Sequence, residues 1–244
     1  MNDLTPTDVL KYKNKGNVRG LIKALYSRDS WAAQDSVIAL GRLKEAQAVE
    51  PLLGLINGFY SGEKGIPELL IPHIVWTLGE ISDIRSLDPL LEIAKLPSAL
   101  SYLGDIQTAI RKIISAILKR NDCDMLASLL KYDSTDVRRI TCSVLGESHG
   151  LYELQLLKAS SLDPNESVRR EVVESLHRIG NPNATQALCD LYSQEPNWDI
   201  REVIVEKLGK MNDDIALQGL NAALNDNMQI IRAKAARFLE SRKP

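Results

Sequence analysis

Four segments in the second half of the chain share one pattern at a nearly constant interval. In each segment an Arg directly follows a Val or Ile, and a Leu comes eight residues after that Val or Ile. The four Leu positions, 145, 176, 208 and 239, are separated by 31, 32 and 31 residues. A period of this size indicates a repeat architecture, in which each unit buries its apolar face against its neighbours. The segments are residues 137–145, 168–176, 200–208 and 231–239.

A second apolar stripe precedes each of these segments at a matching interval. Its Leu residues stand at positions 126, 157, 188 and 220, among apolar residues at helical spacing. Turn-forming stretches such as Asp163-Pro164-Asn165 separate the two stripes. Each repeat is therefore predicted to be two helices joined by a turn, and no stretch of useful length shows the alternation of a strand.

The same register continues toward the N-terminus with less regular spacing. Pro51 and Pro89 indicate the first turns of two helices, where the missing N–H of proline has no bond to lose. We predict an all-α chain that forms a single domain, residues 1–244. It has an N-terminal cap at 1–16 and repeats at about 17–45, 46–83, 84–122, 123–150, 151–181, 182–213 and 214–244.

The paired Val/Ile-Arg motif with an acidic residue ahead of it resembles the HEAT-repeat superfamily, as does the Leu-Gly that ends several second helices. The motifs are most similar to the short-period branch known as phycobilisome-lyase (PBS lyase) HEAT-like repeats, over about residues 17–244. The resemblance implies an armadillo-like α-solenoid, a right-handed superhelix of about seven repeats whose second helices line a concave binding face. The Leu-Gly pairs stand at 40–41, 78–79, 145–146 and 208–209.

An acidic residue stands five or six positions ahead of each repeated Arg. In HEAT proteins such residues form a ladder that ties the turn of one repeat to its neighbour. A planar guanidinium suits this role because it can join a carboxylate and turn carbonyls together. The alternative is a row of arginines for an anionic ligand. The predicted pairs are Asp105 with Arg111, Asp133 with Arg138, Asp163 with Arg169, Glu195 with Arg201, and Asp226 with Arg232.

Helical geometry indicates which residues of the second helices face away from the core. These are the residues two and six positions after the repeated Val or Ile. They include a basic stripe, which is either a binding site or a solvated face, and an acidic stretch beyond it. The basic stripe is Lys112, Arg139 and Arg170, and the acidic stretch is Glu174, Glu202 and Glu206.

The same geometry places Ile38 and Trp76 as apolar surface near the N-terminal end. Exposed aromatic residues often mark interfaces. The alternative for Trp76 is burial against the preceding repeat.

Two inserts, residues 57–65 and 96–104, lengthen the turns of the second and third repeats. Insertions in solenoids fall on loops and often carry function. Neighbouring repeats would place these inserts side by side, with Phe59, Tyr60 and Tyr102 available for a partner or packed against one another.

The sequence carries no recognisable catalytic or metal-binding constellation. His73, His149 and His177 stand in different repeats, and the three cysteines have unrelated spacings. HEAT-like iron hydroxylases carry paired His-Glu motifs, and no His-Glu dipeptide occurs here. We therefore expect no enzyme activity, no cofactor and no metal.

The expected function is that of a non-enzymatic scaffold or adaptor that binds another protein. The resemblance also implies an alternative, a bilin lyase or chromophore chaperone that acts on a phycobiliprotein subunit. A net charge of −2 disfavours nucleic acid as the partner. The chain shows no signal peptide and no apolar stretch long enough to span a membrane, so a cytoplasmic protein is expected.

Overall fold

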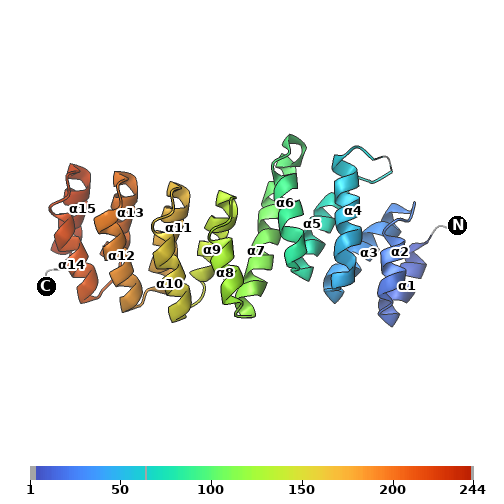
Figure 1. Ribbon diagram of the computed structural model, residues 1–244, viewed down its shortest axis with the longest axis horizontal. Coiled ribbons are helices and arrows are strands. Elements are labelled where there is room, and N and C mark those ends of the chain that lie inside the picture. Colours follow the sequence, from blue (N-terminus) through green and yellow to red (C-terminus); the bar gives the residue numbers. More distant parts are fainter. Residues whose placement is uncertain (1–3, 64, 243–244) are drawn as a thin grey trace. The chain divides into compact units, whose positions relative to one another are not determined.

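The computed structural model describes residues 4–63 and 65–242 and contains only helices within them, so the predicted all-α class is confirmed. The predicted cap, first insert and last repeat include residues 1–3, 64 and 243–244, which lie outside the described residues. Contacts group the chain into two compact units, Met1–Arg120 and Asn121–Pro244, called here the N-terminal and C-terminal units. Each unit is an array of neighbouring helix pairs (Figure 1).

The N-terminal unit opens with the predicted cap and continues with three helix pairs. Thr5 caps the first helix in a capping box with Asp8, in which each side chain bonds the other residue's N–H. Short 3-10 turns lead into three of the later helices. The helices are α1 (Pro6–Lys15), α2 (Val18–Ala24), α3 (Ser30–Leu43), η1 (Ala46–Ala48), α4 (Val49–Tyr60), α5 (Leu70–Ile81), η2 (Ile84–Ser86), α6 (Leu87–Ala94), η3 (Pro97–Tyr102) and α7 (Leu103–Lys119).

The C-terminal unit consists of four helix pairs, and each of the predicted repeat ranges holds one pair. Asn or Asp side chains cap several of these helices, as at Asn181 and Asp213. The helices are α8 (Cys123–Leu129), α9 (Thr135–Leu145), α10 (Leu151–Ser160), α11 (Glu166–Ile179), α12 (Pro182–Gln194), α13 (Trp198–Gly209), α14 (Asp214–Ala223) and α15 (Gln229–Glu240).

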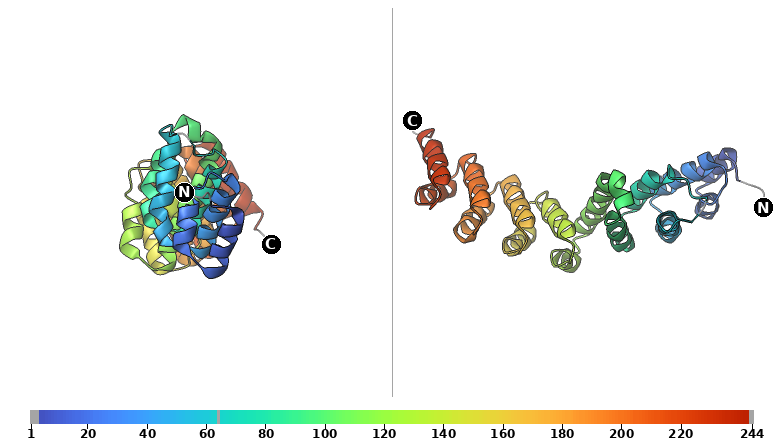
Figure 2. Two further views of the ribbon diagram at one scale, coloured as in Figure 1. Left: turned by 90° about the vertical axis from the view of Figure 1, so that its right-hand side faces the viewer. Right: turned by 90° about the horizontal axis from the view of Figure 1, so that it is seen from above.

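Within each unit the second helix of one pair packs on the second helix of the next (Figure 2). Thus α3 contacts α5 and α5 contacts α7, while α9, α11, α13 and α15 follow one another in the same way. The repeated apolar positions form the core: Val168, Leu176 and Ile200 have no exposed surface. Leu239 is only half-buried, because α15 packs on α13 and α14 and no other described helix covers its opposite side. This layered burial of one pair on the next is that of an α-solenoid.

The glycine of the Leu-Gly motif lies where two second helices approach most closely. A Cβ on Gly79 would be 2.9 Å from the Cα of Ala109, and one on Gly146 would be 2.8 Å from the Cα of Ser175. The Ser175 hydroxyl also donates a 2.9 Å hydrogen bond to the carbonyl oxygen of Cys142 in the preceding second helix. At Gly79 and Gly146 the glycine therefore permits close contact with the backbone of the next repeat, where a methyl group is already too large.

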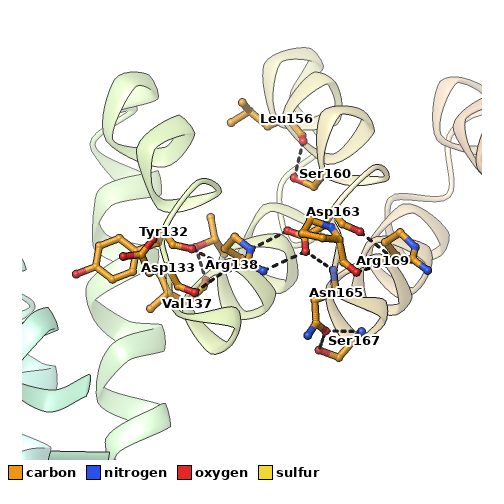
Figure 3. Close-up of polar contacts among 12 residues, drawn as sticks. Tyr132, Asp133, Val137, Arg138, Leu156, Ser160, Asp163, Asn165, Ser167 and Arg169 are labelled. Carbon is orange, nitrogen blue, oxygen red and sulfur yellow. Dashed lines mark hydrogen bonds and ion pairs between the residues drawn. The ribbon is translucent and has the colours of Figure 1, made fainter. Parts of the chain in front are cut away.

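An arginine ladder joins the repeats of the C-terminal unit (Figure 3). Nε and Nη2 of Arg138 donate to the two carboxylate oxygens of Asp163 at 2.7 and 3.1 Å. Its Nη1 donates to the carbonyl oxygens of Tyr132 and Asp133 at 2.8 and 3.0 Å. The guanidinium thereby connects the turn of its own repeat to the turn of the next, which is the bidentate geometry that favours Arg over Lys.

The next two steps of the ladder repeat this arrangement. Arg169 donates twice to Glu195, both at 2.8 Å, and to the Asp163 carbonyl oxygen at 3.0 Å. Arg201 donates twice to Asp226, at 2.9 and 3.1 Å, and to the Glu195 carbonyl oxygen at 3.2 Å. The last member, Arg232, donates to the carbonyl oxygens of Asp226 and Asn227 at 2.7 and 3.0 Å.

The carboxylate partners differ from the predicted ones. We expected each Arg to pair with the acidic residue ahead of it, but that residue offers Arg its backbone carbonyl. For Asp163, Glu195 and Asp226 the carboxylate turns back to the Arg of the preceding repeat, as Asp163 does with Arg138. The predicted pair of Asp105 and Arg111 lies within a single helix, α7, with Asp105 in its first turn.

Burial and hydrogen bonding oppose each other at the ladder carboxylates. Burial alone would raise the pKa of Asp226, but hydrogen bonds from Arg201, from the Tyr192 hydroxyl and from the Met228 N–H lower it to about 2. The same balance lowers the pKa of Glu195, where burial is outweighed by Arg169 and the Asn197 N–H. Both carboxylates are held ionised inside the protein, so each depends on its arginine.

The close approach at Gly79 predicts a large effect from a single methyl group. We expect Gly79→Ala to lower the free energy of unfolding by about 1–3 kcal/mol, because the methyl group collides with backbone. Gly54→Ala is the matched control, since Gly54 lies mid-helix in α4 with nothing within 4 Å of its Cβ position. That change should stabilise the helix by roughly 0.5–1 kcal/mol. Thermal denaturation of both variants tests this, and equal shifts would contradict it.

The ladder predicts that Arg169→Met destabilises the protein by about 3–5 kcal/mol, because Glu195 keeps a buried charge without its partner. The Glu195 side chain is 0% exposed in this pair. Arg139→Met serves as the control, because Arg139 forms only partly exposed ion pairs with Asp136 and Glu171. Its loss should be below about 1 kcal/mol. Urea denaturation measures both changes, and similar losses would refute a structural role for the ladder.

Asp226 predicts a specific loss of stability in acid. Its folded pKa of about 2 lies below the ordinary 3.8, so the carboxylate stabilises the fold above pH about 4. That contribution, roughly 2 kcal/mol, disappears as the pH falls from about 4 to about 2. The stability difference between wild type and Asp226→Asn should therefore shrink over this range in urea titrations. A difference that stays constant with pH would be evidence against it.

Candidate partner-binding site

The structure brings Ile38 and Trp76 together in the N-terminal unit. They come from α3 and α5, two second helices in contact. Both side chains line an open hollow of about 470 Å³. The other lining residues are Arg42, Lys44, His73 and Glu80.

The indole of Trp76 is held in place on two sides. Its ring lies over Gly41, where a Cβ would be 2.8 Å from the ring atom Cζ3. The Nζ of Lys112 lies 5.8 Å from the ring centroid and 2.5 Å from a carboxylate oxygen of Glu80. Even so, 38% of the Trp76 surface is exposed. One part of the ring packs on the preceding repeat, as the alternative interpretation proposed, and the rest faces the hollow.

A polar contact braces the side of this hollow. A ring nitrogen of His73 and the side-chain amide of Gln34 lie 2.9 Å apart, which links α5 to α3. The hollow therefore has an apolar part, a rigid aromatic ring and a charged rim.

A second hollow of about 660 Å³ adjoins the first and shares Lys44 and Glu80 with it. It extends along α7, where Lys112, Ser115, Ala116 and Lys119 follow one another at helical spacing.

Basic side chains dominate the rims of the two hollows. Among the described residues that line them, Glu80 is the one carboxylate, and it already pairs with Lys112. The basic residues are Arg42, Lys44, Arg111, Lys112, Lys119 and Arg120. A local positive field therefore exists on a chain whose net charge is −2.

The other two members of the predicted basic stripe lie in the C-terminal unit. Arg139 and Arg170 line an open hollow of about 810 Å³ at the start of α11. Arg139 lies 3.3 Å from Asp136 and 4.0 Å from Glu171. Arg170 is exposed and forms no ion pair with any residue that the structure describes. Three carboxylates also line this hollow, at Glu166, Glu171 and Glu174, so its rim has no basic excess.

The predicted acidic stretch is interleaved with lysines from the next repeat. Lys207 lies 2.7 Å from Glu174, and Lys234 lies 2.7 Å from Glu202 and 3.7 Å from Glu206. The prediction missed these lysines because they occupy positions three and seven after the repeated Ile. The surface therefore carries ion pairs between repeats.

The aromatic residues of the inserts are engaged within the chain. Phe59 and Tyr60 lie in the last turn of α4, ahead of the loop, with ring centroids 5.2 Å apart at an edge-to-face angle. The Tyr102 hydroxyl donates a 2.9 Å hydrogen bond to Glu68. Burial, followed by the proximity of Tyr102 and Glu68, raises the pKa of Tyr60. The two inserts therefore meet at these side chains.

The thiols sit in apolar or half-buried positions. Burial raises the pKa of Cys142 to about 12 and that of Cys189 to about 11, which keeps both protonated and weakly nucleophilic. In the described ranges, no group of three or more His, Cys, Asp or Glu side chains is arranged to hold a metal ion. None of the helices there has the length and apolar character needed to cross a membrane.

Comparison with known protein families finds a match, which lies in the C-terminal unit. The family model for HEAT repeats matches residues 123–209 and 153–240, which together span most of the C-terminal unit. The match identifies HEAT repeats within this unit.

Solved structures of other proteins are similar to this chain at low identity. Human deoxyhypusine hydroxylase in complex with glycerol is similar at 16% identity, with 95% of this chain and 87% of that chain covered and a TM-score of 0.43. A designed armadillo repeat protein in complex with the peptide (KR)4 has 15% identity, with 93% and 99% covered and a TM-score of 0.36. Similarity this low says nothing about the function of this chain. No protein with a curated function matches it.

Proposed function

We propose that the chain is a non-enzymatic adaptor or scaffold that binds another protein, with the hollow around Trp76 as its binding site. Stacked repeats leave long rows of second-helix side chains open to a partner, which is how solenoid proteins commonly bind. The observation that carries the proposal is the half-exposed Trp76 ring, seated over Gly41 beside Ile38 and Lys112.

A rigid, partly exposed tryptophan favours binding for two physical reasons. A ring already held by its neighbours loses little conformational freedom when a partner covers it. Tryptophan in a pocket is also among the residues that most often dominate the affinity of protein interfaces. Trp31 makes a useful comparison because it is 71% exposed but lines none of the hollows described above.

The histidines support a binding role over catalysis. His73 lies in α5, His149 between α9 and α10, and His177 in α11, and the His73 ring is engaged with Gln34. No described contact pairs a histidine with both a nucleophile and a carboxylate, the arrangement that nucleophilic catalysis uses.

The hollow predicts that Trp76→Ala weakens capture of the protein partner, whereas Trp31→Ala does not. A hot-spot tryptophan contributes about 2 kcal/mol or more, which is roughly a 30-fold loss of affinity. The measurement is quantitative mass spectrometry of proteins retained from the source lysate by wild type and each variant. Ile38→Lys, which places a charge in the same hollow, is a second variant.

Circular dichroism and thermal denaturation establish that each variant is folded. If correctly folded Trp76→Ala and Ile38→Lys retain the same partners as wild type, the proposed site is wrong. A coloured eluate that contains phycobiliprotein subunits would instead support the chromophore-handling alternative. A visible absorption scan of the eluate detects it.

A further inference from the structure

We infer that the two adjoining hollows of the N-terminal unit bind an acidic protein segment with a large apolar side chain. This inference rests on the proposed function and names the chemistry of the partner. Its two parts come from two different features of the surface, the apolar contact at Trp76 and the exposed cations Arg42, Lys44 and Lys119 of the rim.

The apolar part of the segment follows from the first hollow. Ile38 and the exposed part of Trp76 offer a hydrophobic surface of limited size, which suits one aromatic or aliphatic side chain. Burying such a side chain contributes about 1.5–3 kcal/mol. This contact would position the segment.

The acidic part follows from charges that the fold leaves unsatisfied. Arg42, Lys44 and Lys119 are exposed, and none of them forms an ion pair with a residue in the described part of the chain. Elsewhere on the second helices, Lys207 and Lys234 are each neutralised by a glutamate of the neighbouring repeat. The rim of these hollows is therefore complementary to carboxylates, and charge complementarity favours an acidic partner.

The shape of the second hollow suits a continuous chain. Lys112 and Lys119 are seven residues apart in α7, so they lie on one face about 10 Å apart along the helix. Between them, Ser115 and Ala116 line the hollow with small side chains. A segment whose apolar side chain contacts Trp76 can continue along this face, with carboxylates near Lys44 and Lys119.

The same features disfavour a nucleic acid in this place. Single-stranded binding uses aromatic rings that are open to stacking bases. Trp76 is the one tryptophan, tyrosine or phenylalanine among the described residues that line the two hollows, and the ring of His73 is engaged with Gln34. Gly41 and Lys112 already occupy parts of its ring surface.

A display library of random short peptides, selected on the full chain, tests the inference without assuming a sequence. We expect the enriched peptides to combine net negative charge with at least one large apolar residue. Binding of a synthetic enriched peptide is then measured by the fluorescence of Trp76 in a Trp31→Phe, Trp198→Phe background. Affinity should fall as the salt concentration rises, because the rim charges are exposed.

Two variants test whether peptide affinity depends on the cations of this rim or on exposed positive charge in general. The double variant Arg42→Glu, Lys119→Glu changes one exposed cation in each hollow and should weaken the peptide at least tenfold. Arg170→Glu is the matched control, since it changes an exposed, unpaired arginine of the C-terminal unit and should leave the affinity unchanged. Thermal denaturation verifies that all variants are folded.

Several outcomes overturn the inference. It fails if no peptides are enriched, if those enriched are neutral or basic, or if the double variant binds them as wild type does. It also fails if a single-stranded or duplex oligonucleotide binds this rim more tightly than the peptides.

The proposed function is judged separately. If Trp76→Ala loses its lysate partners while the charge-reversed double variant keeps them, the binding site stands and only the acidic chemistry is wrong. If Trp76→Ala keeps those partners, the site itself is wrong.

Discussion

The stacking of the C-terminal unit depends on a guanidinium shared between two turns. Arg169 donates to the Glu195 carboxylate of the next repeat and to the carbonyl oxygens of its own turn. A buried charge is strongly destabilising once its partner is removed, so neither helix pair keeps its turn satisfied without the other. The surrounding apolar side chains stabilise the stack by burial, but the hydrophobic effect does not fix the orientation of one turn relative to the next. The ladder adds bonds with defined geometry between consecutive turns.

The helices and their order were predictable because burial leaves a periodic pattern in the sequence. Val168 and Leu176 recur in register because both face the core. The partner of each arginine was not predictable, because spacing does not reveal which way a turn side chain points. Asp163 illustrates this: its carbonyl oxygen accepts from Arg169, whereas its carboxylate accepts from Arg138. The structural role of the glycine in Leu-Gly was also not predictable, since the residue that it contacts lies on a different helix.

Helical geometry was sufficient to select Ile38 and Trp76, which the structure places in one hollow. It missed Arg42, Lys44 and Lys119, because only two positions of each second helix were considered and these cations lie at or near the C-terminal ends of α3 and α7. The net charge of −2 also concealed them, since it sums acids and bases over the whole chain. A local charge depends on which helices become neighbours, which composition does not contain.

The ion pairs between second helices imply that the repeats of the C-terminal unit are not interchangeable. Glu202 of α13 meets Lys234 of α15, whereas the equivalent residue of α11 is Arg170. If α15 followed α11 directly, Lys234 would face Arg170 in place of Glu202, and its remaining carboxylate would be Glu174, the equivalent of Glu206. Deleting one helix pair, even in perfect register, would therefore replace the shorter ion pair of Lys234 with a contact between like charges. Repeat number in this unit can change only together with the charges at the new boundary.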